Sequence, residues 1–480
     1  MLEPGRLLWR FGATASALAL GACSMAPDYH APQTAFPAQF KEVAGWAAAM
    51  PSDTQARGSW WSAYDDPVLD DLERRAEDAS PTLAAALARY DQARAAVRGS
   101  QSELYPQVDV NAGASRNKLS RDRPLSTGSA PKYNEYSAGG SISYELDLWG
   151  RVRNTVAANR AEAQASNADL ASARLSLQAS VADAYFRLRG LDAQAQLLDR
   201  SVAAFSRARD LIDTRHRGGI VSGIDVNRAR TVLGNAQAQV AAVANDRAAT
   251  EHELAALTGA LASDFGVAPD IRPLEPPTLP AGTPSELLQR RPDIAAAERR
   301  VFAANAQIGV ARAAYFPSLT LGASGGWQAT SGDLLSSPST FWSLGPLSTI
   351  LNLFDGGRRK ADVRISRARY DEITADYRST VLTAFREVED AVAATRHLSS
   401  QAQAQAQAAQ AAQRTSDIAM SRYRDGASDY LDVVTAQTDA LEAQRAYLSV
   451  QTQRMQASVA IVRAMGGSTA ASAIGRSVAG

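Results

Sequence analysis

The chain has 480 residues, and its 50 basic side chains (Lys and Arg) balance 50 acidic ones (Asp and Glu). A net charge of zero argues against nucleic acid as the main partner, because phosphate backbones are bound by an excess of basic groups. The single cysteine excludes an intrachain disulfide, and no apolar run is long enough for a membrane-spanning helix.

The first 22 residues have the pattern of an export signal. Arg6 and Arg10 precede an apolar run that ends at Leu20, and small residues then lead to Cys23. Because the sole cysteine stands at the expected cleavage point, we predict a lipoprotein signal peptide over 1–22 and lipid on the thiol of Cys23. An ordinary signal peptide with a chance cysteine is the alternative. Ser24 follows the cysteine, where an aspartate would have indicated retention in the inner membrane.

Residues 23–80 are predicted to be an N-terminal extended segment, rich in proline and alanine, that ends in a short helix from Trp61 to Asp78. A first repeat is then predicted over 81–260. It begins with a helix that Pro106 ends, because the residue before a proline avoids the helical conformation.

A strand hairpin is predicted next, over 106–148. Apolar residues at alternate positions predict a strand with one apolar face: Val108, Val110, Ala112 and Ala114 alternate with Asp109, Asn111, Gly113 and Ser115. A polar loop follows, and a second alternating run starts near Tyr136. Each arm of the hairpin would have about ten residues.

A helical hairpin is predicted over 150–258. Its first helix runs without a proline from Gly150 to His216, a length of about 100 Å. A proline-rich connector over 261–291 leads to a second repeat, 292–466, before a C-terminal tail, 467–480.

The second repeat has the same order of elements about 210 residues later. A helix from Pro292 precedes a strand hairpin over 317–354 and a helical hairpin over 357–464. Pro346 lies inside the fourth strand, so we expect a bulge or a sheet edge there. The chain is therefore predicted to contain an internal two-fold repeat.

Each helical hairpin turns at a similar tip sequence, His216 to Val226 in the first repeat and Tyr423 to Val433 in the second. Gly219 and Gly426 are predicted to end the preceding helices in the left-handed conformation. Ser222 and Asp429 each stand three residues before an aspartate, a spacing that predicts N-cap boxes.

The helices after the tips carry heptad seams of small and apolar residues, typical of closely packed coiled coils. The last helix has two such seams, which favours a ring of helices. Four strands are too few for a membrane barrel, so strands that cross a membrane would require several chains to share one barrel. A soluble four-stranded sheet on a helical domain is the alternative.

One long stretch carries a resemblance to a known family. It consists of Leu287–Ile294 (LLQRRPDI) and Ala303–Ser318 (AANAQIGVARAAYFPS), and it resembles the signature of outer-membrane efflux lipoproteins. These are the TolC-like channels (NodT/OprM type) of resistance-nodulation-division tripartite pumps. Leu353–Gly357, the second tip, Cys23 and Pro27–Tyr29 also fit this pattern, so the resemblance covers nearly the whole chain.

The resemblance implies an α+β membrane protein that forms a homotrimer. A twelve-stranded β-barrel with four strands from each chain would continue into a twelve-helix periplasmic coiled-coil tunnel. The implied function is an outer-membrane duct that exports small molecules, such as drugs, from a periplasmic adaptor and an inner-membrane pump. The implied localisation is the outer membrane, with a lipid anchor and a long periplasmic extension.

The family closes its tunnel at the helix tips. The resemblance therefore implies that Tyr423, Arg424, Asp429 and Asp432 form the periplasmic gate and adaptor-docking tip, with Gly219 and Gly426 as its turns. Ser428 stands where some members have a linking arginine, and Arg424 is a possible substitute. Helix capping is the alternative role for Asp429 and Asp432, and packing is the alternative for Tyr423.

Two other functions remain open: an exit duct for type I secretion and an envelope scaffold without a pore. A scaffold needs no lipid-facing strands, so the strand hairpins argue against it. The four histidines are scattered, and no metal-ligand cluster, nucleophile motif or phosphate loop stands in a suitable context. We therefore expect no enzyme activity, no metal and no cofactor other than the lipid on Cys23.

Overall fold

The computed structural model describes residues 24–32, 59–122, 132–277, 291–330, 334–335 and 339–467. Cys23, the predicted signal peptide and part of the connector lie outside these ranges. The chain forms two compact units. The sheet unit comprises Met1–Gln33, Arg89–Asn167 and Ala296–Arg378, and the tip unit comprises Thr34–Ala88, Ala168–Ala295 and Ser379–Gly480.

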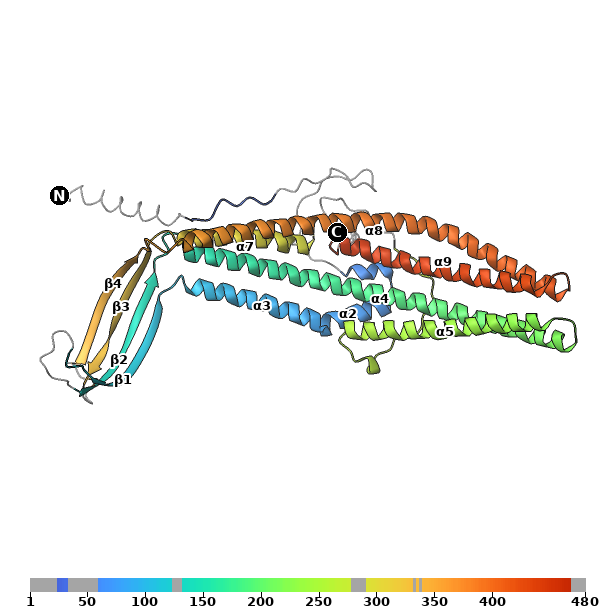
Figure 1. The fold of residues 1–480 in the computed structure, drawn as a ribbon, viewed down its shortest axis with the longest axis horizontal. Coiled ribbons are helices and arrows are strands. Elements are labelled where there is room, and N and C mark those ends of the chain that lie inside the picture. The colour runs from blue at the N-terminus through green and yellow to red at the C-terminus, as the bar shows by residue number, and fades with distance from the viewer. Residues whose placement is uncertain are drawn as a thin grey trace, which may run out of the picture. The chain divides into compact units, whose positions relative to one another are not determined.

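Long helices dominate the described chain (Figure 1). They are α2 (Pro67–Ala79), α3 (Pro81–Ser102), α4 (Arg151–Arg217), α5 (Gly223–Leu257), α7 (Pro292–Ala313), α8 (Arg358–Arg424) and α9 (Tyr430–Ala464), with short 3-10 helices η1 (Trp60–Tyr64) and η2 (Ala262–Asp264). Helices at equivalent places have equal lengths: 22 residues in α3 and α7, 67 in α4 and α8, and 35 in α5 and α9. Among the helices described, none has a stretch apolar and long enough to cross a membrane.

The sheet unit contains one antiparallel sheet of four strands in the order β1-β2-β3-β4 (Figure 1). The strands are β1 (Gln107–Lys118), β2 (Lys132–Glu145), β3 (Ser318–Ala329) and β4 (Thr340–Ile350). The register between β3 and β4 shifts between Leu321 and Ala323, beside Pro346 on the edge strand β4. The bulge and edge predicted around Pro346 are therefore confirmed.

Two aspartates explain why β2 and β4 end before the predicted limits of 148 and 354. Asp147 accepts hydrogen bonds from the N–H groups of Val152 and Arg153, at 3.2 and 2.9 Å. Asp355 accepts from Gly357 and Arg359, at 2.9 and 3.1 Å. These carboxylates satisfy the first N–H groups of α4 and α8, so each chain segment leaves the sheet before the helix begins.

The heptad seam predicted after the first tip is buried along α5. Its buried residues include Val226, Ala229, Leu233, Ala236, Val243, Thr250 and Leu254. Small side chains at this spacing let neighbouring helices approach closely. In the tip unit, a larger core gathers around Trp60, Leu69, Tyr185 and Phe186.

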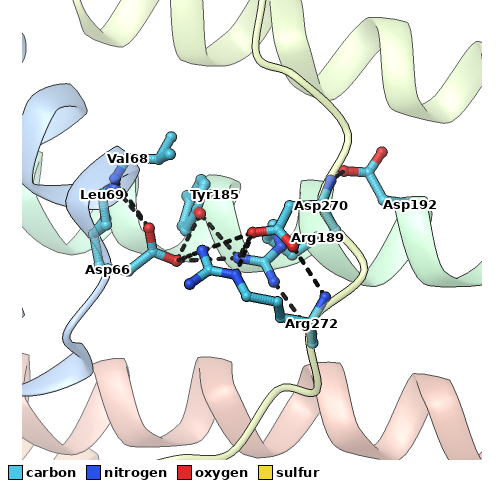
Figure 2. Close-up of polar contacts among 8 residues, drawn as sticks. All are labelled: Asp66, Val68, Leu69, Tyr185, Arg189, Asp192, Asp270 and Arg272. Carbon is cyan, nitrogen blue, oxygen red and sulfur yellow. Dashed lines mark hydrogen bonds and ion pairs between the residues drawn. The ribbon is translucent and has the colours of Figure 1, made fainter.

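A buried ionic network joins α2, α4 and the segment after η2 (Figure 2). Arg189 is only 3% exposed, and its Nη1 donates to Asp66 at 3.0 Å. Its Nε and Nη2 donate to the backbone carbonyls of Asp270 and Arg272, at 2.9 and 3.1 Å. Asp66 is the N-cap of α2 and also accepts from the Tyr185 hydroxyl at 2.8 Å. One guanidinium thus connects three separate parts of the tip unit.

Glu73 on α2 is fully buried, and neither carboxyl oxygen has a hydrogen-bond partner among the residues that the structure covers. Burial raises the pKa of Glu73 from 4.5 to about 9, and the carboxylates of Glu77 and Asp70 add to the rise. The folded chain therefore keeps this carboxyl protonated at neutral pH, whereas the unfolded chain ionises it.

We expect Glu73→Met to stabilise the protein at alkaline pH. With a folded pKa above the unfolded one, the stability linked to Glu73 is fully present below pH 4.5 and is lost as the pH rises to about 9. Met has a similar shape and cannot ionise, so at pH 8, which is 3.5 pH units above the unfolded pKa, the gain should be about 5 kcal/mol. Tm measured from pH 5 to 9 checks this, with the exposed Asp78→Asn as control. Parallel pH profiles for wild type and Glu73→Met would contradict it.

Candidate functional site

The two helical hairpins of the tip unit turn through the same backbone motif. Gly219 and Gly426 have φ angles of 74° and 76°, the left-handed conformation predicted for both. The N–H of Ile220 donates to the carbonyl of Arg215 at 2.9 Å, and that of Ala427 donates to Arg422 at 2.8 Å. Each of these hydrogen bonds runs from the sixth residue of the turn back to the first, which is the pattern of a Schellman motif. The two motifs end α4 and α8 at equivalent residues.

The two tips pack against each other through a small apolar cluster. Its buried members are Ile212, Val226, Ala229, Tyr423, Tyr430 and Val433, drawn from α4, α5, α8 and α9. The rings of Tyr423 and Tyr430 lie 5.5 Å apart. Any movement of one hairpin tip away from the other must open this cluster.

Arg215 makes a polar link between the hairpins that no sequence pattern predicted. Its two Nη atoms donate to the carbonyls of Tyr423 and Arg424 at 3.1 and 3.0 Å. Its guanidinium lies 4.6 Å from the centre of the Tyr423 ring. A side chain of α4 thus caps the last turn of α8, where a cation also suits the helix dipole. Arg422 occupies the equivalent place in the second repeat and caps its own turn, with a bond to Ala427.

The predicted gate residues lie in different environments. Tyr423 is buried within the chain, and its hydroxyl has no partner among the residues described. Arg424, Asp429 and Asp432 are exposed. Ser428 is part-buried, and its hydroxyl also lacks a partner among the described residues.

The prediction of N-cap boxes at the two tips is wrong, because the hydrogen bonds that define such a box are not formed. Ser222 and Asp429 do stand at the N-cap positions of α5 and α9, but neither side chain caps its helix. The hydroxyl of Ser222 instead donates to the carboxylate of Asp225 at 3.1 Å. The carboxylate of Asp429 is therefore left available for other contacts.

A groove of about 510 Å³ lies beside the tip, between α4, α8 and α9. Its apolar lining includes Phe205, Met420 and Leu441, and three arginines, Arg200, Arg207 and Arg424, line it as well. Side chains of this kind suit an interaction surface with both apolar and acidic character.

The sheet has one apolar and one polar face. The apolar face includes Val108, Val110, Ile142, Leu321, Trp342, Leu344 and Leu347, which the strand register places in neighbouring rows. Val110 and Leu344 are 87% and 82% exposed. The opposite face carries Asp109, Asn111, Ser137, Ser141, Ser143, Thr320, Ser324 and Gln328. An apolar face of this extent needs an apolar environment or a partner.

Aromatic residues mark every point where the chain passes between helix and sheet. Tyr105 follows α3, Trp149 precedes α4, Phe316 follows α7 and Phe354 precedes α8. The rings of Trp149 and Phe316 stack at 4.7 Å, and Trp149 donates to the carbonyl of Pro317 at 2.8 Å. We call these four residues the aromatic junction. Rings gathered at one end of an apolar face are typical of a membrane–water interface.

Comparisons with known proteins point to one family over most of the chain. The model of the family "Outer membrane efflux protein" matches residues 72–260 and 283–467. The chain is 34% identical to the pyoverdine export outer membrane protein OpmQ of Pseudomonas aeruginosa, over 94% of this chain and 95% of OpmQ. It is 33% identical to the toluene efflux pump outer membrane protein TtgF of Pseudomonas putida, over 94% of this chain and 95% of TtgF.

Solved structures of outer-membrane channels are also similar to this chain. The outer-membrane channel OprN matches with a TM-score of 0.86 and 31% identity, over 93% of this chain and 99% of OprN. The Campylobacter jejuni outer membrane channel CmeC matches with a TM-score of 0.84 and 26% identity, over 93% and 95% of the two chains. The predicted combination of helices and a sheet is therefore confirmed, and so is the predicted family. The chain belongs to the outer membrane efflux protein family.

Proposed function

We propose that the chain is the passive outer-membrane duct of a tripartite efflux system. As a member of its family it acts at the outer membrane and is not an enzyme. The observation that supports a duct is the four-stranded sheet, with one apolar face, one polar face and two edge strands, β1 and β4. Three copies would join β1 of one chain to β4 of the next and close a twelve-stranded barrel with a polar interior.

The helices would continue this barrel as a periplasmic tunnel. Three chains contribute twelve long helices if α4, α5, α8 and α9 line it, with α3 and α7 completing the bundle. The matched helix lengths and the two successive family matches support a two-fold repeat within each chain. Stacked repeats of this kind suit a ring of helices, because each helix has a neighbour on both sides.

The partners in this proposal are a periplasmic adaptor and an inner-membrane resistance-nodulation-division pump. The exported molecules would be small, since the names of two relatives refer to pyoverdine and toluene. A passive tunnel leaves the choice of substrate to the pump. An exit duct for type I secretion is the alternative with the same architecture, and the lipid on Cys23 is proposed for both.

The purified, detergent-solubilised protein should have a native mass three times that of the mature chain. A single sheet would leave the β1 and β4 edges unpaired in lipid, where each unsatisfied backbone group costs several kcal/mol. Native mass spectrometry or light scattering measures this directly. A stable monomer in a membrane would contradict the barrel, and a trimer without ion conductance in a planar bilayer would favour the scaffold.

We also propose that the tips form the gate and the adaptor-docking surface. Arg215 holds the end of α8 to α4, and three copies would gather the exposed carboxylates of Asp429 and Asp432 near one axis. Such a ring attracts cations. The groove beside the tip, with Arg424 in its lining, offers the adaptor a docking surface.

Arg215→Met should raise the conductance of single channels in a planar bilayer. The change removes two charge-assisted bonds between α4 and α8, roughly 2 kcal/mol per copy. Arg217→Met is the matched control, because within the described chain Arg217 donates only to its own helix. Tyr423→Phe should conduct like wild type, since the lost hydroxyl has no partner in the described chain.

Asp432→Ala should weaken the block of the channel by multivalent cations, because it removes one carboxylate per chain from the proposed ring. If Arg215→Met and Asp432→Ala both behave like wild type, the constriction lies elsewhere.

A further inference from the structure

The first residues after Cys23 lie along one face of α7. We call residues 24–32 the strap. The α7 residues in contact with it are Glu298, Phe302, Asn305, Gly309 and Arg312. They recur every three to four positions and therefore form a single stripe on the helix. We call this stripe, together with Asn154 of α4, the seat.

The seat binds the backbone of the strap at regular intervals. Arg312 donates to the carbonyl of Met25 at 3.3 Å, and Asn305 donates to that of Pro27 at 2.8 Å. Because these bonds reach main-chain carbonyls, they hold the path of the strap. The strap runs antiparallel to α7, with its first residues at the C-terminal end of the helix.

Side chains hold both ends of the strap. Ser24 donates to Asn154 at 2.9 Å. At the other end, the Tyr29 hydroxyl donates to Glu298, and the Tyr29 ring meets Phe302 edge-on at 5.0 Å. The strap is thus anchored immediately after the cysteine and again five residues later.

Gly309 makes room for the strap. A Cβ atom at this position would lie 2.8 Å from the backbone nitrogen of Ala26 and 2.5 Å from Nδ2 of Asn154. Real Cβ atoms do not approach other atoms so closely, so any side chain at position 309 would displace the strap. The seat is therefore a built docking site, whose shape depends on this one glycine.

The seat ends at the aromatic junction. Arg312, which holds Met25, is followed within the next turn by Phe316. A seated strap keeps Cys23 one peptide bond from the anchored Ser24, at this level of the sheet unit. Without the seat, no contact in the described chain would hold Ser24, and with it Cys23, at this level of the sheet unit.

We propose that the seat is a docking site for the lipidated N-terminus, and that it fixes the acyl chains of Cys23 at the aromatic junction, where the strands enter the membrane. This inference rests on the proposed lipidation of Cys23. The acyl chains then enter the membrane at a fixed position beside the sheet. The seat residues that position them are Asn154, Asn305, Gly309 and Arg312.

The test uses the full-length protein in cells fed a fatty acid that carries a photoreactive diazirine. The labelled lipid is incorporated, the membranes are irradiated, and mass spectrometry maps the cross-links. In wild type they should concentrate on the aromatic junction and the adjoining ends of the strands. Gly309→Leu should carry the same amount of label but give about ten-fold fewer cross-links there, because a displaced strap no longer concentrates the lipid beside the aromatic junction.

Gly99→Leu is the matched control, since Gly99 is an exposed helical glycine with open space around it. Asn305→Ala with Arg312→Met removes the two backbone donors without added volume, so it tests the seat if leucine at 309 prevents folding. Chymotrypsin reports strap release in each variant, because cleavage after Tyr29 yields a chain that begins at His30.

Unchanged cross-links in a folded variant whose strap is cleaved would overturn the inference. The inference would also be overturned if the bond after Tyr29 stayed protected from chymotrypsin in both seat variants. Absence of label from wild type would refute the lipidation of Cys23, and with it this role of the seat, while leaving the duct intact.

Discussion

Val110→Lys should prevent stable insertion of the protein into the outer membrane. Val110 lies on the apolar face of β1, is 87% exposed and is paired with Gly140. A lysine facing lipid near the middle of a membrane strand costs about 2–4 kcal/mol, and a trimer would carry three of them. The fraction of protein in outer-membrane pellets, and of trimer that survives mild detergent, measures the effect.

Asn111→Lys is the matched control for Val110→Lys. It adds the same charge to the same strand, one residue further on, but on the polar face beside Gly139. We expect Asn111→Lys to insert normally and to shift the channel toward anion selectivity, because its ammonium would line the barrel. Equal insertion of the two variants would refute the assignment of the apolar face to lipid.

Arg189→Met should cause the largest loss of stability in the tip unit. Of its two cations Asp66 would keep only the exposed Arg272, at 3.5 Å, and the carbonyls of Asp270 and Arg272 would lose their donors. Breaking a buried ion pair in this way costs about 3–5 kcal/mol. We expect Tm to fall by roughly 10 °C at a fixed scan rate.

Arg187→Met, two residues earlier on α4, is the control. Arg187 is 41% exposed and pairs with the equally accessible Glu253, so its loss should cost about 1 kcal/mol or less. Asp66→Asn combined with Arg189→Met should recover part of the loss, since the buried carboxylate that kept only the longer contact with Arg272 is then neutral. Equal Tm values for Arg187→Met and Arg189→Met would contradict a structural role for the network in Figure 2.

Local periodicity made most of the fold predictable from the sequence. Alternation predicted the faces of β1, β2 and β3, and three- and four-residue spacing predicted the buried seam of α5. Gly219 and Gly426 were identified as left-handed turns because few other residues adopt that conformation. The limits of β2 and β4 were less accurate, because Asp147 and Asp355 end them through bonds to the following helices.

Contacts between distant segments were not predictable in the same way. Arg215 caps a helix that lies about 200 residues further along the chain, and only its equivalence with Arg422 in the second repeat hinted at a role. The strap offered no periodicity, since its extended path is set by donors on α7. The gate role of Tyr423 and the tip aspartates was inferred through resemblance and stays a prediction, and the burial of the Tyr423 hydroxyl depends on packing that the sequence does not display.

The two free edges of the sheet have a genetic consequence. If each barrel is completed by one sheet from each of three chains, a cell that produces normal and Val110→Lys chains in equal amounts will build mostly mixed assemblies. Random association would leave only about one assembly in eight without a defective chain. A single altered gene copy should then behave as dominant negative, and sensitivity to the exported compounds in such a merodiploid strain would far exceed the sensitivity caused by halving the gene dose.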